Sequence, residues 1–174
     1  MHIIAGIVAL IGIIAFFIIR ANNTARAGRE IVDTVDDMNA LKRKWDWQRN
    51  AGDGTLPEVD DARLAATAIM CAIAASEGDL TEKQTTHIRQ SISNTFGLNA
   101  SDAEDFLGQG RWLAGQVAGP DGAVLRWWKP ISESCSVQEQ AQAVELLEST
   151  ATVESAVSDE QRHAIQLLKT RLGL

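Results

Sequence analysis

The sequence has little of what builds a sheet, a disulfide framework or a known catalytic site. It holds only three prolines and two cysteines, and no dense run of β-branched residues follows the first twenty positions. Cys71 and Cys135 lack metal-ligand spacing, and Cys71 falls in an apolar helical pattern that predicts a buried, reduced thiol. There is no Gly-rich phosphate loop, no His-Glu-x-x-His and no Gly-x-Ser-x-Gly. The sequence therefore predicts a protein that is not an enzyme.

The charge is acidic, with a formal net value of −7. A negative domain repels nucleic acid and anionic lipid, so neither is expected as the main partner. A cation or a basic protein surface is more compatible with this charge.

The first twenty residues predict a transmembrane anchor. No charged or polar side chain occurs in residues 3–19, a run that reaches roughly 25 Å as a helix. Arg20, Arg26 and Arg29 follow it. Because positive charge flanks the C-terminal end of the run, we expect a short N-terminus outside and the rest of the chain in the cytoplasm.

A cleaved signal peptide is the alternative for this segment, since Ala25-Arg26-Ala27 has the small-x-small form. The domain would then be periplasmic or secreted. No basic residue precedes the apolar run, and the run is long for a signal peptide, so the anchor is favoured.

Residues 21–59 predict a juxtamembrane amphipathic helix and a turn-rich linker. Apolar side chains recur there at helical spacing, with acidic and basic ones opposite, and the stripe needs a surface to cover it. Exposed tryptophans are common anchors of protein interfaces. We expect an integral membrane protein partner to bind this stripe and the paired tryptophans, namely Ile31, Val35, Met38, Trp45, Trp47, Trp127 and Trp128.

Residues 60–174 predict a compact all-α bundle. Four segments with helical periodicity open on the capping-box pattern: Thr81-x-x-Gln84, Ser101-x-x-Glu104, Ser136-x-x-Glu139 and Ser158-x-x-Gln161. A shorter helix is expected over residues 122–129, ended by Pro130. Residues 77–84 resemble residues 154–161, so the bundle should consist of two similar helical hairpins that bury their apolar faces against each other.

One turn offers a candidate metal site. Glu77 and Asp79 flank Gly78, and two carboxylates with a turn carbonyl could bind a divalent cation weakly. In the simpler interpretation Gly78 ends one helix and Asp79 adds negative charge before the next. No other cofactor is expected.

Residues 65–82, an alanine-rich helix running into Glu-Gly-Asp and a capped helix, resemble the core motif of TerB-like domains, the tellurite-resistance-associated family. Phe96-Gly97-Leu98 supplies the ending typical of that family, and residues 136–174 resemble its second hairpin. Ser155-Ala156 replaces the acidic-Gly pair in the second turn, which leaves a second metal site in doubt. One span before such a domain is also similar to the layout of membrane-anchored DnaJ-like co-chaperones, but no His-Pro-Asp is present.

This resemblance implies a bacterial inner-membrane protein with a role in stress response or scaffolding, and divalent-metal binding through acidic turns. We therefore expect a membrane-tethered interaction module. The alternative is an accessory subunit of a large membrane enzyme complex.

Overall fold

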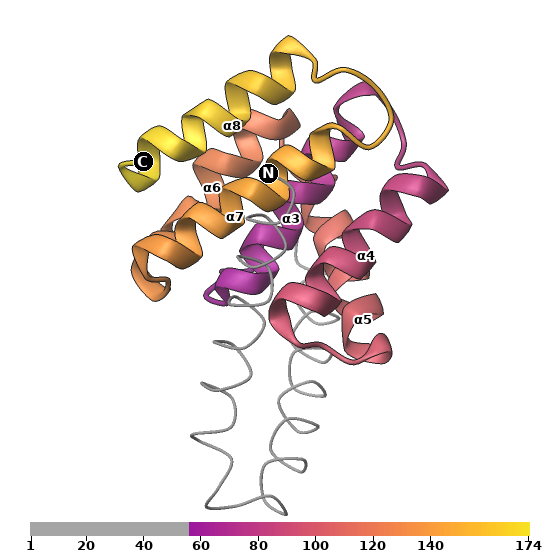
Figure 1. Cartoon of the computed structure of the whole chain (residues 1–174), viewed down its shortest axis with the longest axis horizontal. Helices are drawn as coiled ribbons and strands as arrows, with labels where there is room; N and C mark the ends of the chain where they lie inside the picture. The colour runs from indigo at the N-terminus through magenta and orange to yellow at the C-terminus, as the bar shows by residue number, and fades with distance from the viewer. Residues whose placement is uncertain (1–55) are drawn as a thin grey trace, which may run out of the picture. The chain divides into compact units, whose positions relative to one another are not determined.

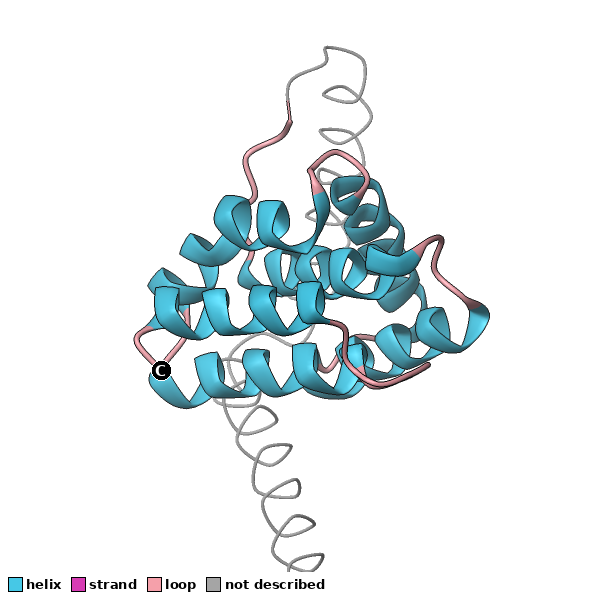
Figure 2. Cartoon of the chain, turned by 90° about the horizontal axis from the view of Figure 1, so that it is seen from above, coloured by secondary structure: helices cyan, strands magenta, loops and turns pink. Residues whose placement is uncertain are grey.

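The computed structural model describes residues 56–174, and within that range the chain is entirely helical, with no strand (Figures 1 and 2). The predicted all-α bundle is confirmed there. Its elements are α3 (Ala62–Ala74), the short 3-10 helix η1 (Ala75–Glu77), α4 (Glu82–Phe96), α5 (Ala100–Ala114), α6 (Gly119–Ser134), α7 (Val137–Ala151) and α8 (Asp159–Leu172).

The chain divides into two compact units. The larger one comprises residues 58–93 and 99–174. No helix of residues 56–174 is both long and apolar enough to cross a bilayer. The expected anchor and amphipathic helix fall outside the described residues.

Helix α3 forms the centre of the larger unit. Every residue from Ala65 to Ala74 is buried, and α5, α6 and α7 all pack against it. Its alanines let these neighbours approach closely. At one crossing, a Cβ placed on Gly110 of α5 would lie 2.8 Å from Thr67 Cγ2 and 3.2 Å from the Thr67 backbone. A side chain at position 110 would therefore force α3 and α5 to shift apart.

A helix buried along its length cannot expose its last carbonyls to water, and a buried carbonyl without a partner is costly. Two glutamines supply donors at the end of α3, where Ser76 Oγ also donates to the Ile73 carbonyl at 2.9 Å. Gln84 Nε2 donates to the Ala74 carbonyl at 3.1 Å, and Gln161 Nε2 donates to the Ile73 carbonyl at 3.0 Å. Both glutamines are buried.

The same two amides close the capping boxes of α4 and α8. Gln84 Oε1 accepts from the Thr81 backbone N–H at 3.0 Å, and Gln161 Oε1 accepts from that of Ser158 at 3.0 Å. The repeat seen in the sequence is therefore also a repeat in space. Its two capped helices both begin next to the end of α3.

Two helix boundaries differ from prediction. Helix α5 is capped by Asn99, whose Oδ1 accepts from the Asp102 backbone N–H at 2.9 Å, so the Ser101 capping box was wrong. Asparagine caps helices as well as serine does. Because the cap is Asn99 and not Ser101, the helix begins earlier and includes all of residues 100–114.

Helix α6 begins at Gly119 and continues through Pro130 to Ser134, so the expected stop at Pro130 was also wrong. Buried Trp127 and Ile131 lie one turn apart on either side of Pro130 and face the core together. Their packing outweighs the hydrogen bond that proline cannot make.

Replacing Gln84 by Glu should destabilise the bundle by about 1–3 kcal/mol, because a carboxylate keeps the capping box but cannot donate to the Ala74 carbonyl. Gln161→Glu should cost less than this, since Ser76 Oγ still donates to the Ile73 carbonyl. A protonated carboxyl can donate, so the loss should shrink as the solution is acidified towards about pH 4. Urea unfolding of the full chain in mild detergent, followed by circular dichroism, measures both effects. Glu139→Gln in the Ser136 capping box is the control, and it should cost less than about 1 kcal/mol. Equal losses for all three variants would contradict this role.

Gly110→Ala should destabilise the bundle by about 1–3 kcal/mol, since its Cβ would meet the backbone of buried Thr67. Gly108→Ala is the matched control on the same helix. Nothing lies within 4 Å of a Cβ there, so alanine should add roughly 0.5–1 kcal/mol of stability. The same unfolding measurement compares the two, and a Gly110→Ala protein as stable as wild type would contradict the close crossing.

Candidate functional site

The acidic turn predicted as a metal site is an exposed helix end. Helix η1 ends at Glu77, and Gly78 takes a φ of 144°, which few other residues adopt. Glu77 and Asp79 are both exposed. No group of three or more His, Cys, Asp or Glu side chains suited to a metal ion occurs in residues 56–174. This geometry is that of a helix end. Binding of a divalent cation by Glu77 and Asp79 stays a prediction.

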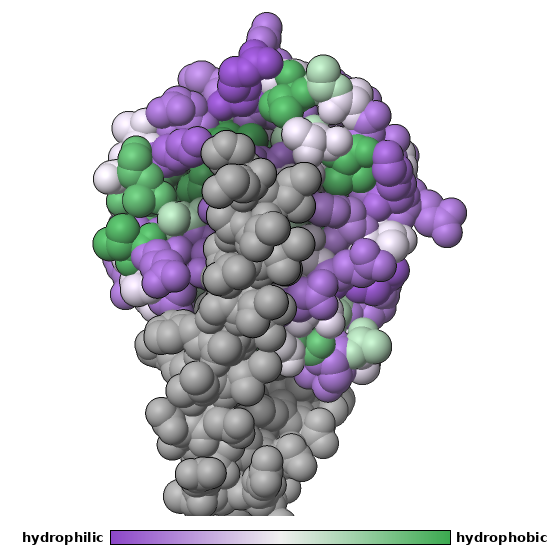
Figure 3. Space-filling view, in the orientation of Figure 1, coloured by the Kyte–Doolittle hydropathy of each residue, from purple (hydrophilic) through white to green (hydrophobic). Residues whose placement is uncertain are grey.

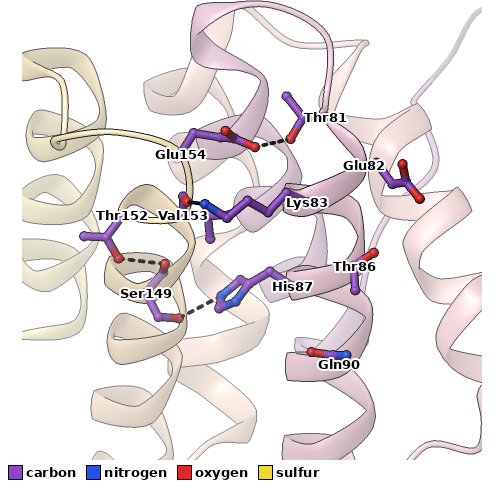
Figure 4. Close-up of a pocket in the computed structure, with 10 residues that line it drawn as sticks. All are labelled: Thr81, Glu82, Lys83, Thr86, His87, Gln90, Ser149, Thr152, Val153 and Glu154. Atoms are coloured by element: carbon purple, nitrogen blue, oxygen red, sulfur yellow. Dashed lines mark hydrogen bonds between the residues drawn. The ribbon is translucent and has the colours of Figure 1, made fainter.

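A polar groove lies between the start of α4 and the end of α7 with the segment that follows it (Figure 4). It is shallow and open, with a volume of about 940 Å³. Its lining is almost wholly polar: Thr81, Glu82, Lys83, Thr86, His87, Gln90, Ser149, Thr152, Val153 and Glu154.

Two hydrogen bonds cross one end of this groove. Lys83 Nζ donates to the Val153 carbonyl, and Thr81 Oγ1 donates to a Glu154 carboxylate oxygen. They tie the beginning of α4 to the segment between α7 and α8, so the lysine and one carboxylate of the groove already have partners.

His87 and Ser149 face each other across the groove, with His87 Nε2 at 3.3 Å from Ser149 Oγ and 3.4 Å from Ser91 Oγ. Ser149 Oγ donates its proton to the Leu146 carbonyl at 2.9 Å, so that proton is not directed at the imidazole. Burial lowers the pKa of His87, which favours its neutral form. No carboxylate of residues 56–174 forms an ion pair with His87. This pair is arranged as a bridge between two helices, not as an activated nucleophile.

The cysteines differ in exposure. Cys71 is fully buried in α3, and burial raises the pKa of its thiol to about 12, so its thiolate is suppressed at neutral pH. Cys135 is partly exposed at the end of α6. The predicted burial of Cys71 is confirmed.

The two described tryptophans of the predicted partner site lie in different places. Trp127 is 2% exposed and belongs to the core, so its ring is not available to a partner. Trp128 is partly exposed, and the Arg171 guanidinium carbon lies 5.6 Å from the centroid of its ring. Ile31, Val35, Met38, Trp45 and Trp47 lie outside the described residues.

Helices α6 and α8 run parallel, and Trp128 lies where they meet. Near their starts, His163 Nδ1 lies 2.7 Å from Asp121 Oδ2, and further along Arg171 covers Trp128. The step from Asp121 to Trp128 along α6 and the step from His163 to Arg171 along α8 have similar lengths and the same direction. The two helices are therefore parallel.

An apolar strip follows this pairing at the surface. Leu125 shares the helical row of Asp121 and Trp128, and Leu167 shares that of His163 and Arg171. Leu125 is 50% exposed, and Leu174, just past the end of α8, is 46% exposed. We call Leu125, Trp128, Leu167 and Leu174 the α6–α8 strip. Figure 3 shows apolar side chains gathered where α8 ends, as one of several apolar patches on this face.

Positive charge borders the strip. Arg126 and Lys129 are exposed on the outer side of α6, and Arg171 is exposed on α8. None of the three forms an ion pair with a carboxylate of residues 56–174, whereas Arg63, Arg89, Arg162 and Lys169 each do. Uncompensated cations beside exposed leucine and tryptophan are typical of a protein interface.

The sequence identified Trp128 but missed the three leucines of the strip. Each leucine looks like an ordinary helix residue until the α6–α8 pairing is known. Periodicity gives the buried face of a helix, but it does not say which neighbour lies beside the exposed face.

Searches against protein-family models, curated protein sequences and solved structures find no match to this chain. The TerB-like resemblance therefore stays a prediction.

Titration calorimetry of the full chain with calcium tests the acidic turn. If Glu77 and Asp79 bind the ion, weak binding heat should appear in the wild type and fall at least several-fold in Asp79→Asn, which removes one charged ligand. Asp105→Asn, at an exposed position of α5, controls for general charge effects. Heat that is absent, or equal in all three proteins, would leave only the helix-end role.

Proposed function

We propose that this chain is a membrane-tethered, non-catalytic interaction module of a bacterial inner-membrane complex. The apolar run of residues 3–19 with its arginine flank supports the tether, and the TerB-like resemblance supports a scaffolding or stress-related role. The α6–α8 strip is the observation that carries the proposal, because it gives the bundle a surface suited to binding another protein.

The composition of the strip favours binding. Tryptophan and arginine are enriched among the few residues that carry most of the binding energy of an interface, and the leucines add apolar contact area around them. Trp128 already has one face against Arg171, so its side chain is held in place before a partner arrives. Less conformational entropy is then lost on binding.

The bundle beneath the strip is suited to presenting it rigidly. Trp127 and Ile131 anchor α6 in the core, and Ala164, Ile165 and Leu168 anchor α8. The strip therefore lies on two fixed helices, where the spacing of its side chains is constant.

A tether adds to the effect of a small surface. Two proteins held in the same bilayer meet at a high effective concentration, so a modest interface is enough for association. This favours an integral membrane partner, or a membrane complex in which the chain is an accessory subunit.

Leu125→Asp and Trp128→Ala should each reduce recovery of the membrane partner about tenfold or more when the tagged full chain is purified in mild detergent, since each removes a central apolar contact. Quantitative mass spectrometry of the co-purified proteins measures the loss. Val137→Asp is the control, because Val137 is 69% exposed but lies at the start of α7 and outside the strip. Variants that keep native helicity and still recover the same proteins as wild type would contradict the proposal.

A further inference from the structure

We infer that the segment received by the α6–α8 strip is an amphipathic helix with acidic residues along its edge. This inference rests on the proposed function and adds the chemistry of the partner.

The geometry favours a helix as the occupant. Two parallel helices leave a shallow seam between them, and a third helix fits along such a seam with apolar side chains at i, i+3 or i+4, and i+7. The positions from His163 to Arg171 cover about 12 Å of α8, which matches roughly two turns of a partner helix. An extended strand would instead need an open sheet edge, and residues 56–174 contain no strand.

The local charges favour an acidic partner. Arg126 and Lys129 on one side of the strip and Arg171 on the other have no carboxylate partner among residues 56–174. An acidic edge would neutralise them. The net charge of the whole chain predicts the opposite, a basic partner, so the local charge decides the expected chemistry at this surface.

The same cations do not favour an anionic lipid surface. Residues 56–174 contain 17 Asp and Glu against nine Lys and Arg. A domain of net charge −8 is repelled by an anionic leaflet as a whole, and three cations at one seam do not reverse that. A protein helix touches only the seam and avoids the remaining carboxylates.

Site-specific photocrosslinking in native membranes tests the inference directly. A photoreactive benzophenone amino acid replaces Leu125 in the tagged full chain, and a second protein carries it at Val137 as the control position. After irradiation, the crosslinked peptide is sequenced. The expected product at position 125, absent at position 137, is a protein segment with apolar residues at helical spacing and neighbouring Asp or Glu.

Charge variants give a second measurement. The double variant Arg126→Glu with Lys129→Glu should lower partner recovery about tenfold, while Arg111→Glu on α5 should leave it within about twofold. Recovery of the partner by the wild type should also fall as salt is raised, because salt screens exposed charges.

The outcomes separate this inference from the proposed function. A crosslink at position 125 to a basic protein segment, with recovery unaffected by the charge variants, overturns the acidic helix and leaves the interaction module standing. A crosslink at position 125 to lipid alone overturns the inference in favour of a membrane surface. No crosslink at position 125, together with full recovery by Trp128→Ala, overturns both.

Discussion

The fold depends on how the carbonyl end of one buried helix is satisfied. Helix α3 is surrounded by protein, so the carbonyls of Ile73 and Ala74 cannot form hydrogen bonds with water. The amides of Gln84 and Gln161 take that place, and each also caps the helix to which it belongs. Two side chains therefore join two helix starts to one helix end, and Ser76 Oγ adds a further hydrogen bond to the Ile73 carbonyl at 2.9 Å. The negative end of the α3 dipole also faces the positive ends of α4 and α8, which is favourable.

This arrangement explains why glutamine closes these two boxes. In the Ser136 box the partner is Glu139, whose carboxylate accepts hydrogen bonds from Ser136. A carboxylate cannot donate to the carbonyl of another helix. The neighbouring residue Gln140 is the donor here: its Nε2 donates to the Cys135 carbonyl at 2.9 Å and so caps the end of α6. A first-turn glutamine that donates to the end of another helix is thus used three times in the bundle.

Much of the fold could be predicted from the sequence, because capping boxes and apolar stripes are local signals. Three of the four boxes occur as expected, and Gln84 and Gln161 of the two similar segments both donate to the end of α3. Helix α3, however, packs mainly on α5 and α6, which belong to neither predicted hairpin. One error arose at Asn99, where two possible capping residues competed. The other arose at Pro130, where packing of the helix outweighed the local signal to stop.

The candidate site was less predictable. Trp127 and Trp128 are adjacent in sequence, yet only the position of the core decides which of them reaches the surface.

The parallel direction of α6 and α8 has a consequence for the way this domain meets other molecules. Asp121, Asp159 and Glu160 lie in the first turns of these helices, and Lys169 and Arg171 lie in the last turn of α8. In α8 these charges oppose the helix dipole, which is positive at the start of a helix and negative at its end, and so they stabilise both ends. In α6 Asp121 does this at the start, and the last turn holds no basic residue. Full side-chain charges outweigh the half charges of the dipoles, so the start of the helix pair is negative and its end is positive. The pair therefore carries an electric moment along its axis. In the field of a charged neighbour that moment exerts a torque, so the domain would be rotated towards one orientation before any side chain makes contact.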